Sequence, residues 1–305
     1  MGRRQRGRAV RRCGVTEYLH LLPQFRPLME LSDADRLAAI QSRWVDYEFA
    51  DKVHAMLYAK LSGHRDQPDI FLLGGSRMGK TTIIKRFIEV HAPGFINQEG
   101  YREKPVLLIE VDHPSPRQFL IEILGTSISP YNPDASVEKL FFQALHLLRE
   151  CNTKMLVIDE VHTITQGTPR EMTAMAGMIK RLSNKTGIAI VGVGVKFSRQ
   201  LLVKDEQYAN RFVTVTVPEW TPLGFRGLLK GFESFLPLRL PSKLSTKQMA
   251  MLIYEKTQGN TAKVEELLLG CARQAIITGK ECIDEELLSQ KKWTIDSSGI
   301  REAAP

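Results

Sequence analysis

The most informative segment of the chain is Gly74-Gly75-Ser76-Arg77-Met78-Gly79-Lys80-Thr81. It fits the pattern GxxxxGK[ST], in which glycines let the backbone fold tightly and aim its N–H groups inward. An apolar run at residues 70–73 precedes it, as expected of a strand buried on both faces, and a helical pattern begins at residue 79. The amino end of such a helix attracts anions. This order of strand, loop and helix predicts a phosphate-binding loop.

Individual side chains of the loop have predicted roles. Lys80 is a mobile positive charge for the β- and γ-phosphates, and the Thr81 hydroxyl is a ligand for Mg²⁺. Residues 74–81, together with Thr82, are expected to hold ATP or another nucleoside triphosphate. ATP and Mg²⁺ are therefore the cofactors that we predict.

A second motif joins an apolar run to two acidic residues. The strand expected at residues 155–158 is followed directly by Asp159 and Glu160. Asp159 is predicted to hold the Mg²⁺ shell, and Glu160 to orient and deprotonate the attacking water. The alternative is a pair of solvated charges that opens a loop. After a phosphate-binding loop, the pair indicates hydrolysis of ATP to ADP and phosphate.

Strand and helix patterns alternate through the middle of the chain. Apolar runs predict five strands, at residues 70–73, 105–111, 155–158, 188–193 and 212–217. The helical patterns between them predict an α/β fold, with a five-stranded parallel sheet between two layers of helices. After Pro218 only helical patterns remain, and these predict a small C-terminal helical lid domain.

The same patterns divide the chain into five parts. We expect a basic flexible arm, an N-terminal helical extension, the α/β nucleotide-binding domain, the lid domain and a C-terminal tail. Their predicted limits are residues 1–15, 16–65, 66–220, 221–290 and 291–305.

The positive charge of the chain is concentrated in the arm. The net charge is +8, and six arginines precede residue 13 with no acidic residue among them, so the remainder carries +2. The arm either contacts the phosphate backbone of DNA, or is a solvated tail, or reflects a start-site artefact.

Membrane and disulfide chemistry are not indicated by the sequence. No apolar run approaches the roughly 18 residues that span a bilayer, and the arginine-rich start lacks the apolar segment of a secretory signal. The four cysteines form no CxxC pair, which favours reduced thiols. We therefore expect a cytoplasmic protein without membrane contact.

Four residues outside the two motifs are further candidates. Arg211, before the fifth expected strand, is predicted to reach the γ-phosphate of a neighbouring subunit as an arginine finger, the alternative being a surface ion pair. Lys263, at the start of a lid helix, either senses the γ-phosphate or is a solvated lysine. Trp44 and Tyr47 either line the base pocket or pack in the core.

These segments, in this order, resemble the AAA+ ATPases and, among them, the TniB/TnsC family of transposition regulators. The resemblance covers residues 30–290, and its later pieces are more specific to TniB-like proteins than the nucleotide motifs are. The pieces are Arg43-Trp44 with Tyr47, the phosphate-binding loop, Leu156-Val157-Ile158-Asp159-Glu160-Val161-His162, Ile190-Val191-Gly192-Val193-Gly194, Asp205-Glu206-Gln207 through Asn210-Arg211-Phe212, Val217-Pro218-Glu219-Trp220, and LPLRLPS at 236–242.

The resemblance implies an AAA+ core in an ATP-dependent protein that binds duplex DNA largely independently of sequence. Such proteins form homo-oligomeric rings or filaments on DNA, and hydrolysis of ATP disassembles them. A DDE transposase, which they recruit or activate, and a TniQ-like target adaptor are the implied partners, in a bacterial, nucleoid-associated location. The resemblance also implies DNA contacts from the loop after the second strand and the following helix, here His113, Arg117, Thr126 and Ser127.

One position departs from the family pattern. Similar proteins tend to have GVGT after the fourth strand, where this chain has Gly192-Val193-Gly194-Val195. Valine cannot donate a hydrogen bond to the γ-phosphate or water, and the loss of one such contact costs about 10²-fold in rate. Hydrolysis is therefore expected to be slow, unless another residue takes the role, and an ATP-sensing scaffold with little turnover remains an alternative. An AAA+ helicase loader or initiator is a second alternative, because it shares the same nucleotide motifs.

Overall fold

The computed structural model describes residues 18–63, 68–100, 102–126, 131–199 and 211–290. The chain forms two compact units, which are described separately. One unit consists of residues 46–219, and the other combines residues 1–45 with residues 220–305. The predicted arm at 1–15 and tail at 291–305 lie outside the described residues.

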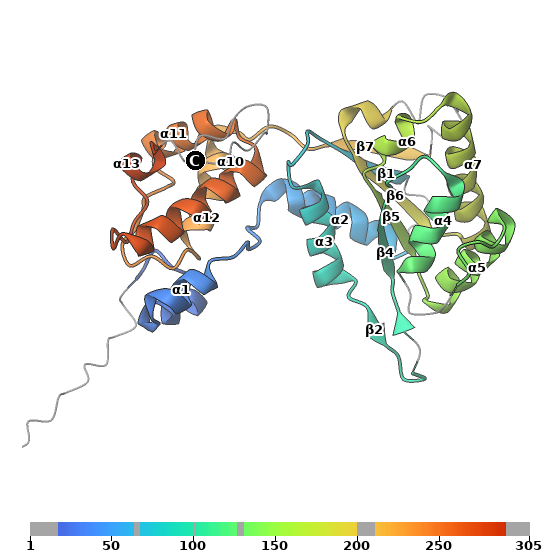
Figure 1. The fold of residues 1–305 in the computed structure, drawn as a ribbon, viewed down its shortest axis with the longest axis horizontal. Coiled ribbons are helices and arrows are strands. Elements are labelled where there is room, and N and C mark those ends of the chain that lie inside the picture. The colour runs from blue at the N-terminus through green and yellow to red at the C-terminus, as the bar shows by residue number, and fades with distance from the viewer. Residues whose placement is uncertain (1–17, 64–67, 101, 127–130, 200–210, 291–305) are drawn as a thin grey trace, which may run out of the picture. The chain divides into compact units, whose positions relative to one another are not determined.

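The first unit is built on a five-stranded parallel sheet, as predicted (Figure 1). The strand order is β4-β5-β6-β1-β7. The strands are β1 Asp69–Leu73, β4 Val106–Glu110, β5 Met155–Asp159, β6 Ala189–Gly194 and β7 Phe212–Thr216. The three central strands are buried at every position, since helices cover both faces of the sheet.

Helices form a layer on each face of this sheet. Figure 1 places α2 (Glu48–Leu61) and α3 (Lys80–His91) on one face, and α4 (Pro116–Gly125), α5 (Val137–Glu150) and α7 (Pro169–Thr186) on the other. This αβα arrangement confirms the predicted fold class.

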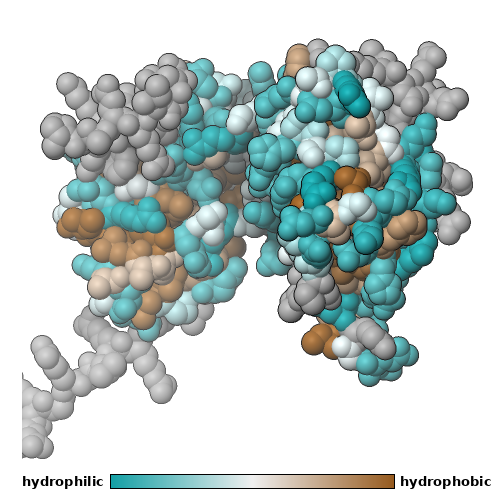
Figure 2. Space-filling view, turned by 45° about the vertical axis from the view of Figure 1, so that its right-hand side comes forward, coloured by the Kyte–Doolittle hydropathy of each residue, from teal (hydrophilic) through white to brown (hydrophobic). Residues whose placement is uncertain are grey.

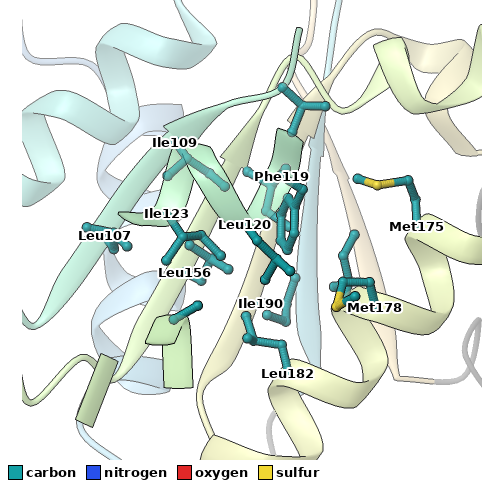
Figure 3. Close-up of a cluster of buried hydrophobic side chains, with 14 of the residues drawn as sticks. Leu107, Ile109, Phe119, Leu120, Ile123, Leu156, Met175, Met178, Leu182 and Ile190 are labelled. Atoms are coloured by element: carbon teal, nitrogen blue, oxygen red, sulfur yellow. The ribbon is translucent and has the colours of Figure 1, made fainter. Parts of the chain in front are cut away.

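The main core of the unit lies under the second of these layers. Side chains of β4, β5 and β6 face those of α4 and α7, and Figure 3 shows them interdigitating: Leu107, Ile109, Leu156 and Ile190 from the strands, Phe119, Leu120 and Ile123 from α4, and Met175, Met178 and Leu182 from α7. The helix α7 has clear local signals at both ends. The Thr168 hydroxyl accepts a hydrogen bond from the Glu171 N–H, and Gly187 ends the helix in a left-handed conformation.

A small antiparallel hairpin was not predicted. It pairs β2 (Phe95–Ile96) with β3 (Arg102–Glu103), before β4. Phe95 and Ile96 are 49% and 72% exposed, and apolar surface gathers at this end of the unit in Figure 2. Strands of two exposed residues leave no apolar periodicity in the sequence, so the pattern could not predict them.

The second unit is helical. Its helices are η1 (Pro23–Glu30), α1 (Asp33–Ala39), α10 (Pro222–Glu233), α11 (Lys247–Thr257), α12 (Thr261–Ile277) and α13 (Glu285–Leu288). Its core includes Phe225, Leu229, Ile253, Val264 and Leu268. The absence of strands after Pro218 agrees with the sequence pattern within the described residues.

The expected extension at residues 16–65 is not one body, and the structure divides it at Val45. Its first part, with α1, packs on α12, whereas α2 belongs to the αβα unit. Arg36, which is fully buried, takes part in this contact. Its guanidinium donates to Glu281 Oε2 at 2.8 Å and to the Pro237 carbonyl at 3.1 Å. Leu37 and Ile40 add apolar contacts with the core of the helical unit, so both kinds of interaction hold the segment there.

Within the part of the chain that the structure describes, no helix is long and apolar enough to cross a bilayer.

The neighbouring phenylalanines of α5 provide a matched test of the core. Phe141 is 0% exposed and Phe142 is 59% exposed. We expect Phe141→Ala to lower the free energy of unfolding by about 3–5 kcal/mol, because it leaves a cavity, and Phe142→Ala to lower it by less than about 1 kcal/mol. Urea denaturation of both variants measures the difference. Equal losses would contradict the position of α5 on the sheet.

Candidate nucleotide-binding site

The loop at residues 74–81 joins the carboxyl end of β1 to the amino end of α3, as predicted. Two of its residues adopt left-handed backbone conformations: Arg77 with φ 59° and Gly79 with φ 81°. An alanine at position 79 would be strained for this reason alone. Ser76 and Arg77 are exposed, and Thr82 lies on the exposed side of α3.

Close packing explains the first two glycines of the loop. A Cβ atom on Gly74 would lie 2.9 Å from Val217 Cβ, and one on Gly75 would lie 2.9 Å from Met78 Sδ. Both distances are shorter than carbon and sulfur atoms tolerate. The Gly74 N–H also donates to the Gly194 carbonyl at 3.1 Å, which ties the start of the loop to the end of β6.

Lys80 is buried with its ammonium group turned into the loop. Its Nζ donates to the Gly75 carbonyl at 2.7 Å and to the Gly74 carbonyl at 3.3 Å. Burial lowers the pKa of Lys80, while the negative charges of Glu160 and Asp159 oppose that shift. A desolvated cation at the centre of a ring of backbone amides is suited to bind an anionic phosphate.

Thr81 and Asp159 meet across the carboxyl edge of the sheet. The Thr81 hydroxyl donates to Asp159 Oδ2 at 2.6 Å, and Asp159 Oδ1 accepts from the Glu160 N–H at 2.8 Å. A hydroxyl and a carboxylate oxygen side by side fit Mg²⁺, which prefers oxygen ligands and keeps waters and phosphate oxygens for the rest of its shell. In the described chain no group of three or more His, Cys, Asp or Glu residues forms a separate metal site.

Glu160 follows β5 in a left-handed conformation, with φ 52°. Its side chain is 41% exposed, and its Oε2 lies 2.8 Å from Nδ1 of His162. The charge of Glu160 also acts on Lys80. The carboxylate therefore lies close to the phosphate-binding loop. His162 is among the residues that carry the family resemblance, but no function was predicted for it.

Arg211 lies at the opposite edge of the sheet from the loop. It precedes β7, whose first residue is in register with Asp69, and its carbonyl accepts from the Asp69 N–H at 2.6 Å. The 5 residues of β1 separate this edge from the loop, a span of roughly 16 Å. Its guanidinium donates to Asn184 Oδ1 at 3.0 Å on the surface. Arg211 therefore does not complete the site of its own chain.

The remaining nucleotide candidates belong to other elements. Lys263 is in the first turn of α12, in the helical unit, where its N–H donates to the Asn260 side chain at 3.2 Å. Tyr47 precedes α2 in the αβα unit, and burial, with a smaller contribution from the charge of Asp51, raises its pKa to about 12. Trp44 belongs to the helical unit.

The predicted DNA contacts occupy the region between β4 and the segment after α4. His113 is exposed. Arg117 donates to the carbonyls of Ala135 and Pro133 at 2.9 and 2.7 Å, so part of its guanidinium holds its own chain. The Thr126 hydroxyl donates to the Ile123 carbonyl at 2.7 Å. Ser127 lies outside the described residues.

The end of β6 carries the departure from the family pattern. Val195 is partly exposed, and its carbonyl accepts from the Ser198 N–H at 2.9 Å. Ser198 is fully buried, and its hydroxyl has no hydrogen-bond partner. A Cβ atom on Gly194 would lie 2.7 Å from this hydroxyl, so the chain after β6 packs directly on the strand.

Comparison with protein families identifies the chain. The family described as Bacterial TniB protein matches residues 36–222, more than half of the sequence. The chain belongs to the TniB family. The match spans the loop, the acidic pair and Arg211, as expected from the resemblance. Among curated proteins no match was found.

Solved structures share the fold of this TniB protein. The Aeropyrum pernix ORC2 protein in its ADPNP–ADP complexes is 13% identical, with a TM-score of 0.61 over 85% of this chain and 71% of that one. CDC6P from Pyrobaculum aerophilum is 16% identical, with a TM-score of 0.55 over 83% and 68%. Domain III of Thermotoga maritima DnaA is 15% identical, with a TM-score of 0.52 over 80% and 91%. These similarities establish the AAA+ ATPase fold.

The contact between Thr81 and Asp159 leads to a test of magnesium binding. Thr81→Val keeps the shape of the side chain and removes the oxygen, so we expect Mg–ATP binding to weaken about 10- to 100-fold, and Thr81→Ser to retain it. Titration with a fluorescent ATP analogue, in Mg²⁺ and in EDTA, measures the effect. If the valine variant binds equally well in Mg²⁺, the hydroxyl is not a ligand.

Proposed function

We propose that this TniB protein is an ATPase that assembles on duplex DNA and regulates DNA transposition. The observation that carries the proposal is the placement of Lys80, Thr81, Asp159 and Glu160 at one edge of the sheet in a member of the TniB family. Binding of ATP drives assembly, and hydrolysis releases it.

The residues at this edge divide the chemistry among them. The loop amides, the positive end of α3 and Lys80 bind the phosphates, while Thr81 and Asp159 hold Mg²⁺. Bound Mg²⁺ neutralises charge on the phosphate oxygens. Glu160 orients the attacking water and accepts its proton. Lys263 of the lid is a further contact to the nucleotide.

The site is completed by a second copy of the chain. Arg211 is exposed at the far edge of the sheet, and among the described residues its guanidinium donates a hydrogen bond to the neutral amide of Asn184. In an oligomer stacked edge to edge, this guanidinium faces the γ-phosphate held by the neighbour and stabilises the transition state. Whether ATP or its hydrolysis product occupies the shared site thereby controls assembly.

We propose the DNA and protein partners from the resemblance to the family. Duplex DNA is bound largely through its phosphates, with His113, Arg117, Thr126 and Ser127 as the proposed contacts, which gives affinity without sequence specificity. A TniQ-like adaptor and a DDE transposase are the proposed protein partners. A protein of the same fold, the Aeropyrum pernix ORC1 protein, has been solved in complex with DNA.

Two other functions have observations in their favour. The fold is shared with ORC2 and CDC6P, which favours a helicase loader or initiator. Val195 favours an ATP-sensing scaffold with little turnover. DNA-stimulated ATPase activity argues against the scaffold, and a transposase gene next to the gene for this chain argues against the initiator.

The glutamate provides the direct test of hydrolysis. We expect Glu160→Gln to lower kcat about 100-fold or more, because the amide cannot accept the proton of the water. Binding of ATP and assembly on DNA should persist, since Lys80 and Thr81 are unchanged. Phosphate release and electron microscopy with non-specific duplex DNA measure the two outcomes. Intact turnover would remove Glu160 from this role, and no assembly with any ATP analogue would refute the function.

Mixing two inactive variants tests whether the site is shared. We expect Arg211→Ala to lower turnover about 10³-fold. Lys80→Ala should be inactive because its loop is damaged, while its Arg211 remains intact. The mixture should recover turnover, because a Lys80→Ala subunit supplies Arg211 to the intact loop of its neighbour.

Asn184→Ala is the control for this experiment, because it removes the hydrogen bond that Arg211 makes within its own chain. Its turnover should match that of the wild type. A mixture as inactive as its components, or an Arg211→Ala variant with full turnover, would show that subunits do not share the site.

A further inference from the structure

A corner of the site not used by the proposed function contains His162. This residue begins α6 (His162–Thr165), directly after the acidic pair. Its Nδ1 lies 2.8 Å from Oε2 of Glu160, the distance of an ion pair. Nδ1 is buried, and in its present orientation it forms no hydrogen bond with any of the described residues. The Glu160 carboxylate therefore lies within hydrogen-bonding distance of this nitrogen without being aligned with it.

A buried nitrogen of this kind favours contact with a carboxylate. An N–H group without a partner in the protein interior is costly, and a small rotation of the ring or of the carboxylate aligns the two groups. A bond from N–H to a charged oxygen is stronger than one between neutral groups. His162 therefore has a strong preference for one orientation of Glu160.

The backbone of His162 is fixed more firmly than the Glu160 side chain. The N–H of Val161 donates to the Val193 carbonyl of β6 at 2.9 Å. A Cβ atom on Gly194 would lie 2.9 Å from Val161 Cγ1 and 3.4 Å from the His162 backbone nitrogen, so α6 begins directly against β6. Glu160, with 41% of its side chain exposed, has no comparable restraint. The backbone that carries the ring is therefore anchored to β6, whereas the Glu160 carboxylate is the more exposed of the two groups.

Glu160 also acts on the phosphate-binding loop through its charge. Burial lowers the pKa of Lys80, and the negative charge of Glu160 opposes that shift. The direct contact of the Glu160 carboxylate is with His162, and both residues follow β5.

We infer that His162 is a positioning residue that holds the Glu160 carboxylate in the orientation needed to activate water. The inference rests on the proposed ATPase function and goes beyond it, because His162 has no contact with the nucleotide in this role. The Nδ1–H group donates to Glu160 Oε2, and the ring restricts the rotation of the carboxylate. Loss of this restraint slows the chemical step and leaves ATP binding unchanged.

Two substitutions separate the hydrogen bond from packing. In His162→Leu the side chain keeps much of its volume and loses the donor. In His162→Asn the amide nitrogen lies close to the place of Nδ1 and can donate in its stead. We expect the leucine variant to lower kcat about 10- to 100-fold, since a misplaced catalytic group costs that much, and the asparagine variant to recover most of the loss.

The matched control is His146, an exposed histidine of α5 whose Nδ1 lies 3.8 Å from Glu150. His146→Leu should leave kcat unchanged. The Kd of a fluorescent ATP analogue and the Tm of every variant should stay at the wild-type values. In the Glu160→Gln background, His162→Leu should cause no further loss, because the two residues act through one group.

A second measurement reports the contact without turnover. In protein labelled with ¹⁵N-histidine, the Nδ1 signal of His162 is assigned by its absence from the His162→Asn variant. Glu160→Ala should shift this signal and leave that of His146 in place. An unchanged His162 signal would overturn the inference, even in an active enzyme.

The kinetic outcomes separate this inference from the function on which it rests. Wild-type kcat in His162→Leu, or a His162→Asn variant as slow as His162→Leu, refutes the positioning role alone. A wild-type protein that binds Mg–ATP without turnover refutes the ATPase itself and the role of His162 with it.

Discussion

The position of β6 between β1 and β5 is the constraint on which the site depends. Parallel strands lie about 4.8 Å apart, so the phosphate-binding loop after β1 and the acidic pair after β5 are about 10 Å apart at their strand ends. The hydrogen bond between Thr81 and Asp159, at 2.6 Å, closes this distance over the end of β6. Gly194 ends this strand, and a side chain there would overlap Ser198 and Val161. The glycine therefore lets the segments after β5 and β6 pack directly on the end of the strand.

The same parallel geometry separates the two halves of the proposed reaction. The residues proposed to bind phosphate and metal lie at the carboxyl edge, whereas Arg211 enters β7 at the amino edge. Since the strands are parallel, no local rearrangement brings Arg211 to the loop of its own chain. The proposed role of Arg211 in catalysis therefore requires a second subunit, while within its own chain it donates a hydrogen bond to Asn184. Assembly of two subunits then also completes the site, because it brings Arg211 of one subunit to the loop of the other.

Much of the fold could be predicted because buried parallel strands leave a continuous apolar signal. All five expected strands are present, and their limits agree within one or two residues. The loop and the acidic pair were predictable because few residue types can cradle phosphate or hold Mg²⁺. Other features depend on partners distant in sequence. Arg36 looks like a surface arginine until Glu281 is placed beside it, and this pair is one of the contacts between α1 and the helical unit. The approach of Nδ1 to Glu160 depends on the left-handed backbone at Glu160, which no sequence pattern indicated.

The residues at the end of β6 also affect whether ATP hydrolysis and ATP binding depend on the same groups. Val195 offers no hydrogen bond to water or phosphate, so the polar control of the reaction falls to groups around Glu160. If His162 orients Glu160 from a backbone fixed on β6, the rate of hydrolysis depends on a residue that does not touch ATP. The affinity for ATP depends instead on Lys80, Thr81 and the loop amides. Assembly, which needs binding, and release, which needs hydrolysis, are then set by different residues. Under the proposed function this separation has a consequence, because slower hydrolysis prolongs the assembled state on DNA without weakening it.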